Sequence, residues 1–224
     1  MRGLEGRDVT RSEDELPLPV FIGPTDAPAV GVVGGGLGAD SMVDALRAGG
    51  RYRAGVVDGI AIPAMAPCDI LIFPERIDPK TYTKDHCWLI WDWVGAGGAL
   101  VLTHDAVGYR DHPVLFPWVC SGGTAHVENA PVDVIWARPG CVPVGRIMPI
   151  YPEHILLQPC IRADMTPIAI DPDTEKPAVM GAAFDTGKVV ACGLALGASP
   201  KEHDVTLTEG ECGLLEAMLD WLLR

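Results

Sequence analysis

The stretch GGALVLTHDAVGYRDH, residues 97–112, joins an apolar run to a polar loop. Residues 99–103 (ALVLT) are apolar on both faces, which predicts a strand in the interior of a parallel sheet. Ligands of open α/β sheets bind beyond the carboxyl ends of such strands. The loop that begins at His104 is therefore the first candidate site, with polar side chains at Asp105, Tyr109, Arg110, Asp111 and His112.

Strand and helix patterns alternate around this stretch. Short apolar runs at 29–35, 52–58 and 69–75 predict further strands. The spacing of Met42, Val43 and Leu46 predicts one helix, and Leu89, Ile90, Trp93 and Val94 predict a second that starts near Asp78 and Pro79. This alternation predicts an α/β fold with a doubly wound, mostly parallel sheet.

The second half of the chain is richer in predicted strands. They cover 132–137, 167–171 and 178–184, and a turn at Asp185 to Gly187 returns the chain to the sheet through KVVACG, residues 188–193. A helix with apolar residues at helical spacing closes the chain. We expect interior positions for 29–34, 69–74, 99–103 and 188–193. Residues 1–28, with their prolines, are expected to form a flexible arm before one domain of residues 29–224.

Composition restricts the class of partner. The formal net charge of −13 disfavours nucleic acid and anionic membranes, which require a basic face. We expect a cytoplasmic protein with a small polar ligand, because no apolar run is long enough to span a membrane and no signal peptide is recognisable. The seven cysteines are scattered without a CxxC pair, so neither disulfides nor a thiolate zinc site is expected.

A glycine-rich turn follows the first strand. Gly34, Gly36 and Ala39 satisfy the G-x-G-x-x-A dinucleotide fingerprint, and Asp58 ends the next strand about 20 residues later. A nicotinamide-dependent oxidoreductase is therefore one hypothesis. The alternative is that these glycines only allow a sharp turn, and the short segment between the second and third strands favours it.

The segments CDILIFP, GGALVLTHDAVGYR, YPEHILLQP and DTGKVVACGLALG resemble the trehalose-utilisation (ThuA-like) branch of the class I glutamine amidotransferase-like superfamily. The resemblance spans about residues 29–223 and implies a flavodoxin-like sheet. Gly97, Gly98 and His104 match its G-G-G-x-x-x-x-H run in order. The amidotransferases carry a nucleophilic cysteine at this strand-to-helix elbow, whereas this chain has none there and lacks their late histidine. A cysteine-dependent glutaminase is therefore not expected.

The candidate catalytic residues are His104 and Glu153, either of which could act as a general base. Glu153 and His154 correspond loosely to an acidic residue and a histidine of the ThuA-like pattern. The candidate ligand-binding residues are Asp105, Tyr109, Arg110, His112, His154, Gly35 and Glu75. No cofactor is implied, but a divalent metal is an open alternative whose candidate ligands are His104, His112 and His154, with Asp105, Glu153 and His126 as further donors.

Three functions follow from these residues. The first is an amidotransferase-like domain without glutaminase activity that binds or processes a small polar ligand, such as a sugar derivative, around His104; as an enzyme it would be a hydrolase or another carbohydrate-processing enzyme. The second is a non-catalytic sensor or assembly module of the same fold, and the nicotinamide enzyme is third. A homo-oligomer is a further expectation.

Overall fold

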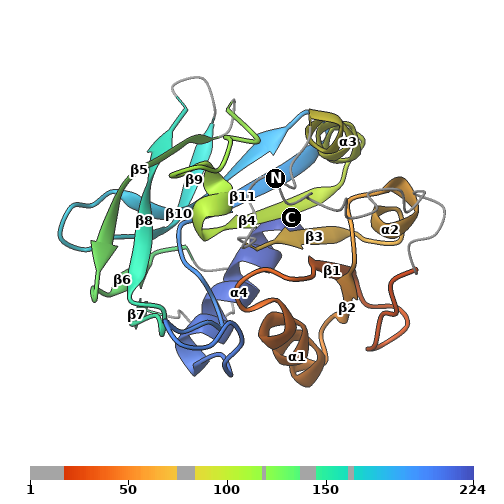
Figure 1. The fold of residues 1–224 in the computed structure, drawn as a ribbon, viewed down its shortest axis with the longest axis horizontal. Helices are drawn as coiled ribbons and strands as arrows, with labels where there is room; N and C mark the ends of the chain where they lie inside the picture. Colours follow the sequence, from red (N-terminus) through yellow and green to blue (C-terminus); the bar gives the residue numbers. More distant parts are fainter. Residues whose placement is uncertain (1–17, 75–83, 118–119, 137–144, 161–163) are drawn as a thin grey trace, which may run out of the picture.

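The computed structural model describes residues 18–74, 84–117, 120–136, 145–160 and 164–224. Within these residues the strands form a nine-stranded sheet in the order β2-β1-β3-β4-β11-β10-β9-β6-β7 and a separate two-stranded ribbon, β5-β8. Figure 1 shows the ribbon at the opposite end of the molecule from β1 and β2.

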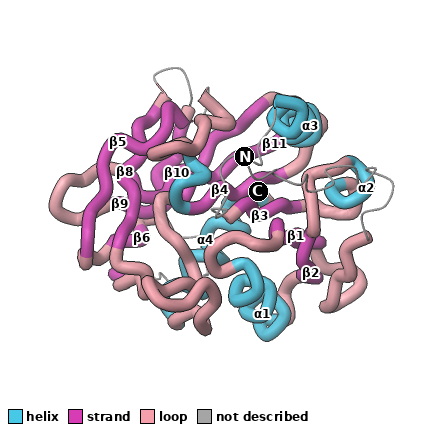
Figure 2. Tube along the Cα trace, viewed as in Figure 1, coloured by secondary structure: helices cyan, strands magenta, loops and turns pink. Residues whose placement is uncertain are grey.

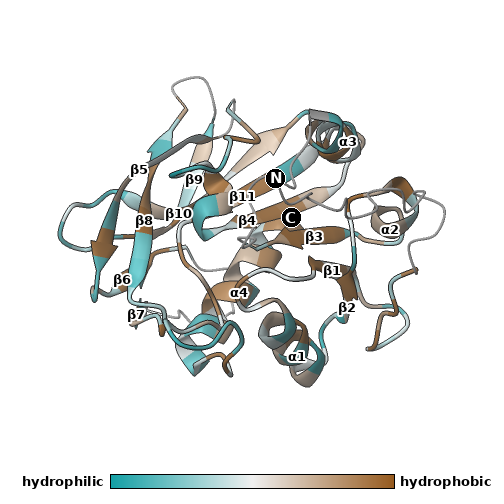
Figure 3. Cartoon of the chain, viewed as in Figure 1, coloured by the Kyte–Doolittle hydropathy of each residue, from teal (hydrophilic) through white to brown (hydrophobic). Residues whose placement is uncertain are grey.

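One half of the large sheet is parallel. It contains β2 (Arg53–Val57), β1 (Ala29–Val33), β3 (Ile70–Phe73), β4 (Ala99–Thr103) and β11 (Gly187–Cys192). All residues of β1, β3 and β4 are buried, and Figure 3 shows that these strands are mostly hydrophobic. The four runs predicted to be interior strands are all interior, and the order agrees in general terms with a flavodoxin-like fold.

The other half of the sheet is antiparallel. The hairpin of β10 (Pro177–Phe184) and β11 reverses the chain direction, and β9 (Met165–Ile170), β6 (Val132–Val134) and β7 (Gly145–Ile147) continue the antiparallel pairing. The sheet is therefore mixed, and the prediction of a mostly parallel sheet holds only for its first half. The prediction of a β-rich second half is confirmed.

Helices lie on both faces of the sheet (Figure 2). Helices α1 (Ala39–Gly49) and α4 (Glu209–Leu222) pack into one hydrophobic core. The second core holds α2 (Ile62–Met65), α3 (Lys84–Gly95) and apolar residues of the ribbon. The expected start of the second helix at Asp78 and Pro79 lies outside the described residues.

The ribbon consists of β5 (Cys120–Glu128) and β8 (Glu153–Pro159), which pair antiparallel. Its attachment to the sheet runs through the backbone that follows β11: the Ile155 N–H donates to the Gly193 carbonyl at 2.8 Å, and His154 bridges Leu194. A Cβ at Gly193 would lie 1.9 Å from the Ile155 carbonyl oxygen, so this close approach requires glycine. The contact holds β8 beside the carboxyl ends of β4 and β11.

The described part of the expected N-terminal arm, residues 18–28, lies against the edge of the sheet. Ile22 and Ala54 exchange backbone hydrogen bonds of 3.1 and 3.0 Å. The flexible arm itself stays a prediction, because residues 1–17 lie outside the description. Among the described helices, none has the length and apolar character needed to cross a membrane. The six described cysteines are free thiols.

Candidate active site

The chain turns sharply at His104, directly after β4. This residue has a left-handed backbone, with φ 48°, and begins a short 3-10 helix (His104–Val107). The strand-to-helix elbow implied by the resemblance is therefore present, with histidine at its corner. A left-handed non-glycine residue costs about 1–3 kcal/mol and such residues concentrate at functional sites. The local backbone thus marks this position independently of its side chain.

The His104 side chain is buried between two carboxylates. Its Nδ1 lies 3.5 Å from Asp105 Oδ1, and its Nε2 lies 3.9 Å from Glu153 Oε1. The Tyr151 ring meets the imidazole edge to face, with ring centroids 5.2 Å apart. Only 1% of the His104 side chain is exposed, against 16% of Glu153. Of these two candidate catalytic residues, Glu153 is therefore the one that solvent or a ligand can reach.

Arg110 connects the loop to the ribbon. One guanidinium nitrogen donates to Asp105 Oδ2 at 3.2 Å and the other bonds to Glu153 Oε1. Arg110 also has a left-handed backbone, φ 53°, and its guanidinium lies 5.6 Å from the centre of the Tyr109 ring. Four predicted residues, His104, Asp105, Arg110 and Glu153, thus form one cluster, which we call the His104 cluster.

The outer edge of this cluster contains a further histidine and carboxylate. The Tyr109 hydroxyl lies 3.2 Å from His126 Nδ1, and His126 Nε2 lies 3.8 Å from Glu128 Oε1. One ligand atom each from His126, Glu128 and Glu153 falls within 4.8 Å of the others. In the part of the chain that the structure describes, this is the group with metal-ligand spacing, and none of the candidates His104, His112 and His154 belongs to it.

His154 faces away from the cluster. Successive side chains of a strand point to opposite sides, so Glu153 reaches Arg110 while the buried His154 lies with Nε2 3.6 Å from Asp171 Oδ2. Burial lowers the pKa of His154, outweighing the opposing effect of Asp171. The expected role of His154 as a ligand-binding or metal-binding residue beside His104 is therefore not supported, and the structure assigns it to the protein interior.

The other predicted site residues are His112, Gly35 and Glu75. His112 is buried, and its backbone N–H donates to the Tyr109 carbonyl. Gly35 is exposed just beyond β1, with φ 77°. Glu75 lies outside the described residues. The sequence analysis missed two residues beside the cluster: Tyr151, whose ring contacts His104, and Glu128, which faces His126.

The glycine-rich turn after β1 does not present a free phosphate site. At the start of α1, the backbone N–H groups of Asp40 and Ser41 both donate to Asp204 Oδ1, at 3.0 and 3.2 Å. A Cβ at Gly38 would meet the Leu196 carbonyl at 1.7 Å. A carboxylate of the chain thus satisfies the donors that a pyrophosphate would use, which favours a turn-forming role for the glycines over a nicotinamide site.

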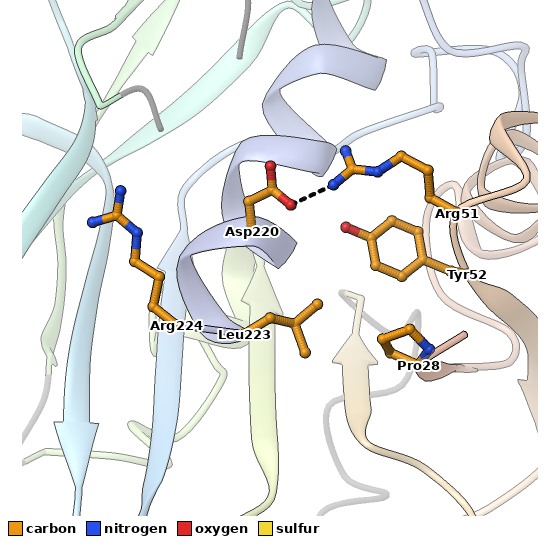
Figure 4. Close-up of a pocket in the computed structure, with 6 residues that line it drawn as sticks. All are labelled: Pro28, Arg51, Tyr52, Asp220, Leu223 and Arg224. Carbon is orange, nitrogen blue, oxygen red and sulfur yellow. Dashed lines mark hydrogen bonds and ion pairs between the residues drawn. The ribbon is translucent and has the colours of Figure 1, made fainter. Parts of the chain in front are cut away.

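Two cavities open at the opposite end of the parallel strands. The smaller, about 400 Å³, is shown in Figure 4; Arg51 donates to Asp220 at 2.6 Å beside the Tyr52 ring. The larger, about 620 Å³, is lined by segments that precede β3, β4 and β11 and shares Leu223 and Arg224 with the smaller. Burial raises the pKa of Tyr52 to about 12. Neither cavity contains a residue of the His104 cluster.

Among the described residues, no activated thiol accompanies the elbow. Cys120, at the start of β5, is buried, and that burial raises the pKa of its thiol to about 11. A thiol with so high a pKa is a poor nucleophile at neutral pH. The described residues therefore offer imidazole, carboxylate and guanidinium groups at this end of the sheet, and no cysteine in the position of the amidotransferase nucleophile.

Comparison with known proteins identifies the fold. No protein-family model and no curated protein matches the chain. Among solved structures, a cytoplasmic protein, STM1381, from Salmonella typhimurium LT2 is 13% identical with a TM-score of 0.61, covering 87% of this chain and 98% of that one. The mmIFT52 N-terminal domain is also 13% identical, with a TM-score of 0.61. That match covers 88% of this chain and 97% of the other. A protein described as ThuA-like from Bacteroides uniformis is 12% identical with a TM-score of 0.58, covering 90% and 94%. The chain thus has the fold of ThuA-like proteins.

Proposed function

We propose that this chain is a ThuA-like domain without glutaminase activity that binds a small polar ligand, such as a sugar derivative, at the His104 cluster. The observation that carries the proposal is the pair of left-handed residues, His104 and Arg110, beyond the carboxyl end of β4. Two such residues in one loop are costly in stability. Glycine adopts such angles without this steric cost.

The chemistry of the cluster favours a ligand with several hydroxyl groups. Glu153 can accept hydrogen bonds from hydroxyl groups, and Arg110, whose side chain is 44% exposed, can donate to their oxygens. The half-buried rings of Tyr109 and Tyr151 provide apolar surface beside these groups. The net charge of −13 favours a small ligand over a polyanion. A cytoplasmic location belongs to the same proposal.

A reaction at this site would use Glu153 as the general base. The buried His104 would then act as a positioning residue, because its Nε2 faces Glu153 Oε1 from 3.9 Å and its ring is covered by Tyr151. The complete burial of His104 also favours the second function, a non-catalytic sensor or assembly module of the same fold. Incubating a bound ligand with the protein and following it by NMR separates the two, since only the enzyme converts it.

The test is calorimetric binding of a panel of sugars and sugar acids to the wild type and two variants. Glu153→Gln keeps the shape of the side chain, and we expect it to weaken binding at least tenfold. His104→Ala should lower the free energy of unfolding by about 1–3 kcal/mol, because it leaves buried polar partners unsatisfied, and should also abolish binding well below its melting temperature. A destabilised His104→Ala that binds as tightly as the wild type would overturn the proposal.

A further inference from the structure

One face of the β5-β8 ribbon brings three metal-ligating side chains together. His126 and Glu128 are two positions apart on β5 and therefore share a face. In the register of the ribbon, Glu128 lies directly opposite Glu153. One donor atom from each of the three side chains lies within 4.8 Å of the other two.

This arrangement is electrostatically unfavourable without a cation. Like charges directly opposite one another on paired strands destabilise the pairing, and Glu128 and Glu153 are such a pair. Arg110 contacts Glu153 and Asp105. Among the described residues, the ion-pair partner of Glu128 is His126, whose Nε2 lies 3.8 Å from Glu128 Oε1. A positive charge between the two glutamates would remove their repulsion.

The His126 ring is held in an orientation that suits a metal ligand. Its Nδ1 lies 3.2 Å from the Tyr109 hydroxyl, and its Nε2 faces Glu128. When Nδ1–H donates to the Tyr109 oxygen, the lone pair of Nε2 points toward the carboxylates. Metal-binding histidines almost always use their second nitrogen in such a hydrogen bond, which fixes the tautomer and the ring orientation.

We propose that His126, Glu128 and Glu153 bind one divalent transition-metal ion. In a tetrahedral site, ligand atoms about 2.0–2.2 Å from one ion lie roughly 3.3–3.6 Å apart. The three donor atoms, which lie within 4.8 Å of one another, therefore have to close by at most about 1.5 Å. The side chains of His126 and Glu128 are 42% and 66% exposed and free to make this movement. One imidazole and two carboxylates suit zinc or manganese, and three protein ligands leave a position for water or a ligand.

The proposed metal site is separate from the proposed binding of a polar ligand, because it is argued from the geometry of the ribbon alone. Glu153 serves both, because Arg110 bonds to one of its carboxylate oxygens and the other oxygen remains for an ion. A ligand hydroxyl group bound at the His104 cluster would lie close to such an ion. Either proposal can fail without the other, since metal binding is measured here in the absence of any sugar.

The test uses Mn²⁺ alone as the probe, because free thiols in the chain compete for softer ions such as Zn²⁺. The full chain is treated with a chelator, dialysed and titrated with Mn²⁺, and free Mn²⁺ is followed by its EPR signal. We expect one bound ion per chain. His126→Ala and Glu128→Gln should each weaken binding at least tenfold, and Tyr109→Phe should weaken it less.

His203→Ala is the matched control, because His203 is an exposed histidine outside the ribbon. It should bind Mn²⁺ like the wild type. The variants at His126 and Glu128 should fold normally, since both side chains are exposed, and their melting temperatures verify this. Absence of saturable binding to the wild type, or equal binding by the His126, Glu128 and His203 variants, would refute the site.

Discussion

Two arginines at opposite ends of the parallel strands each bind two carboxylates and lie over the ring of a neighbouring tyrosine. Arg51, before β2, pairs with Glu216 and Asp220 of α4, 5.5 Å from the centre of the Tyr52 ring. Arg110, after β4, pairs with Asp105 and Glu153, 5.6 Å from the Tyr109 ring. The two arginine side chains are almost equally exposed, 42% and 44%.

The backbone separates these two regions. Arg110 and His104 have a left-handed backbone, whereas Arg51 and Tyr52 do not. The Arg51 contacts join one loop to a helix, and the Arg110 contacts surround a buried histidine. The same ion-pair chemistry therefore serves architecture at the amino end of the strands and, in our proposal, ligand binding at the carboxyl end. The cavities at the amino end do not change this assignment, because they contain no residue with strained backbone other than glycine.

Of the two arginines, Arg51 at the amino end is expected to have the larger effect on stability. Arg51→Ala leaves Asp220, whose side chain is 6% exposed, without this ion pair. We expect a loss of about 2 kcal/mol in the free energy of unfolding, less than the roughly 3–5 kcal/mol of a fully buried pair because Arg51 is partly exposed. Urea unfolding measures it. The control is Arg146→Ala, which breaks the exposed pair with Asp133 and should cost clearly less than Arg51→Ala. Equal losses of unfolding free energy in the two variants would contradict an architectural role of Arg51.

The parallel half of the fold was predictable from sequence, because strands buried on both faces read as continuous apolar runs. The ribbon was not, because Gly122 and Gly123 interrupt any alternation in β5 and the pairing shifts register beside Gly123. The same difference explains which site residues could be grouped together from the sequence. His104, Asp105 and Arg110 follow a predicted strand, and their proximity could be expected. Because the sequence analysis predicted no strand at the position of β8, it could not use the alternation of side chains along that strand. That alternation places Glu153 inside the cluster and His154 outside it.

Adjacent residues of β8 sharpen the comparison through pH. Because burial lowers the pKa of His154 in the folded chain below its usual 6.5, the unfolded chain binds more protons as pH falls below that value. His154 therefore supports folding at neutral pH, and this contribution is lost on acidification. We expect His154→Gln to show a smaller fall in unfolding free energy between pH 7.5 and 5.5 than the wild type, measured by urea unfolding. A pH dependence in the His154 variant identical to that of the wild type would contradict a structural role.

The smallest expected effect concerns the strained backbone itself. Glycine adopts φ 48° without the steric cost that a side chain imposes. His104→Gly should therefore be more stable than His104→Ala by about 1 kcal/mol, although both variants lack the imidazole. Thermal unfolding of the two variants measures the difference. At Ala106, with an ordinary backbone in the same short helix, glycine should instead be less stable than alanine. A His104→Gly variant no more stable than His104→Ala would mean that the elbow is not strained.

The most direct test of the account compares the two arginines by ligand affinity. A sugar or sugar acid that binds the wild type in calorimetry is titrated into Arg110→Ala and Arg51→Ala, each at a temperature where the variant is folded. The account predicts at least a tenfold loss of affinity for Arg110→Ala and an unchanged affinity for Arg51→Ala. The opposite pattern would move the ligand to the cavities at the amino end, and the absence of binding by any member of the panel would contradict the proposed class of ligand.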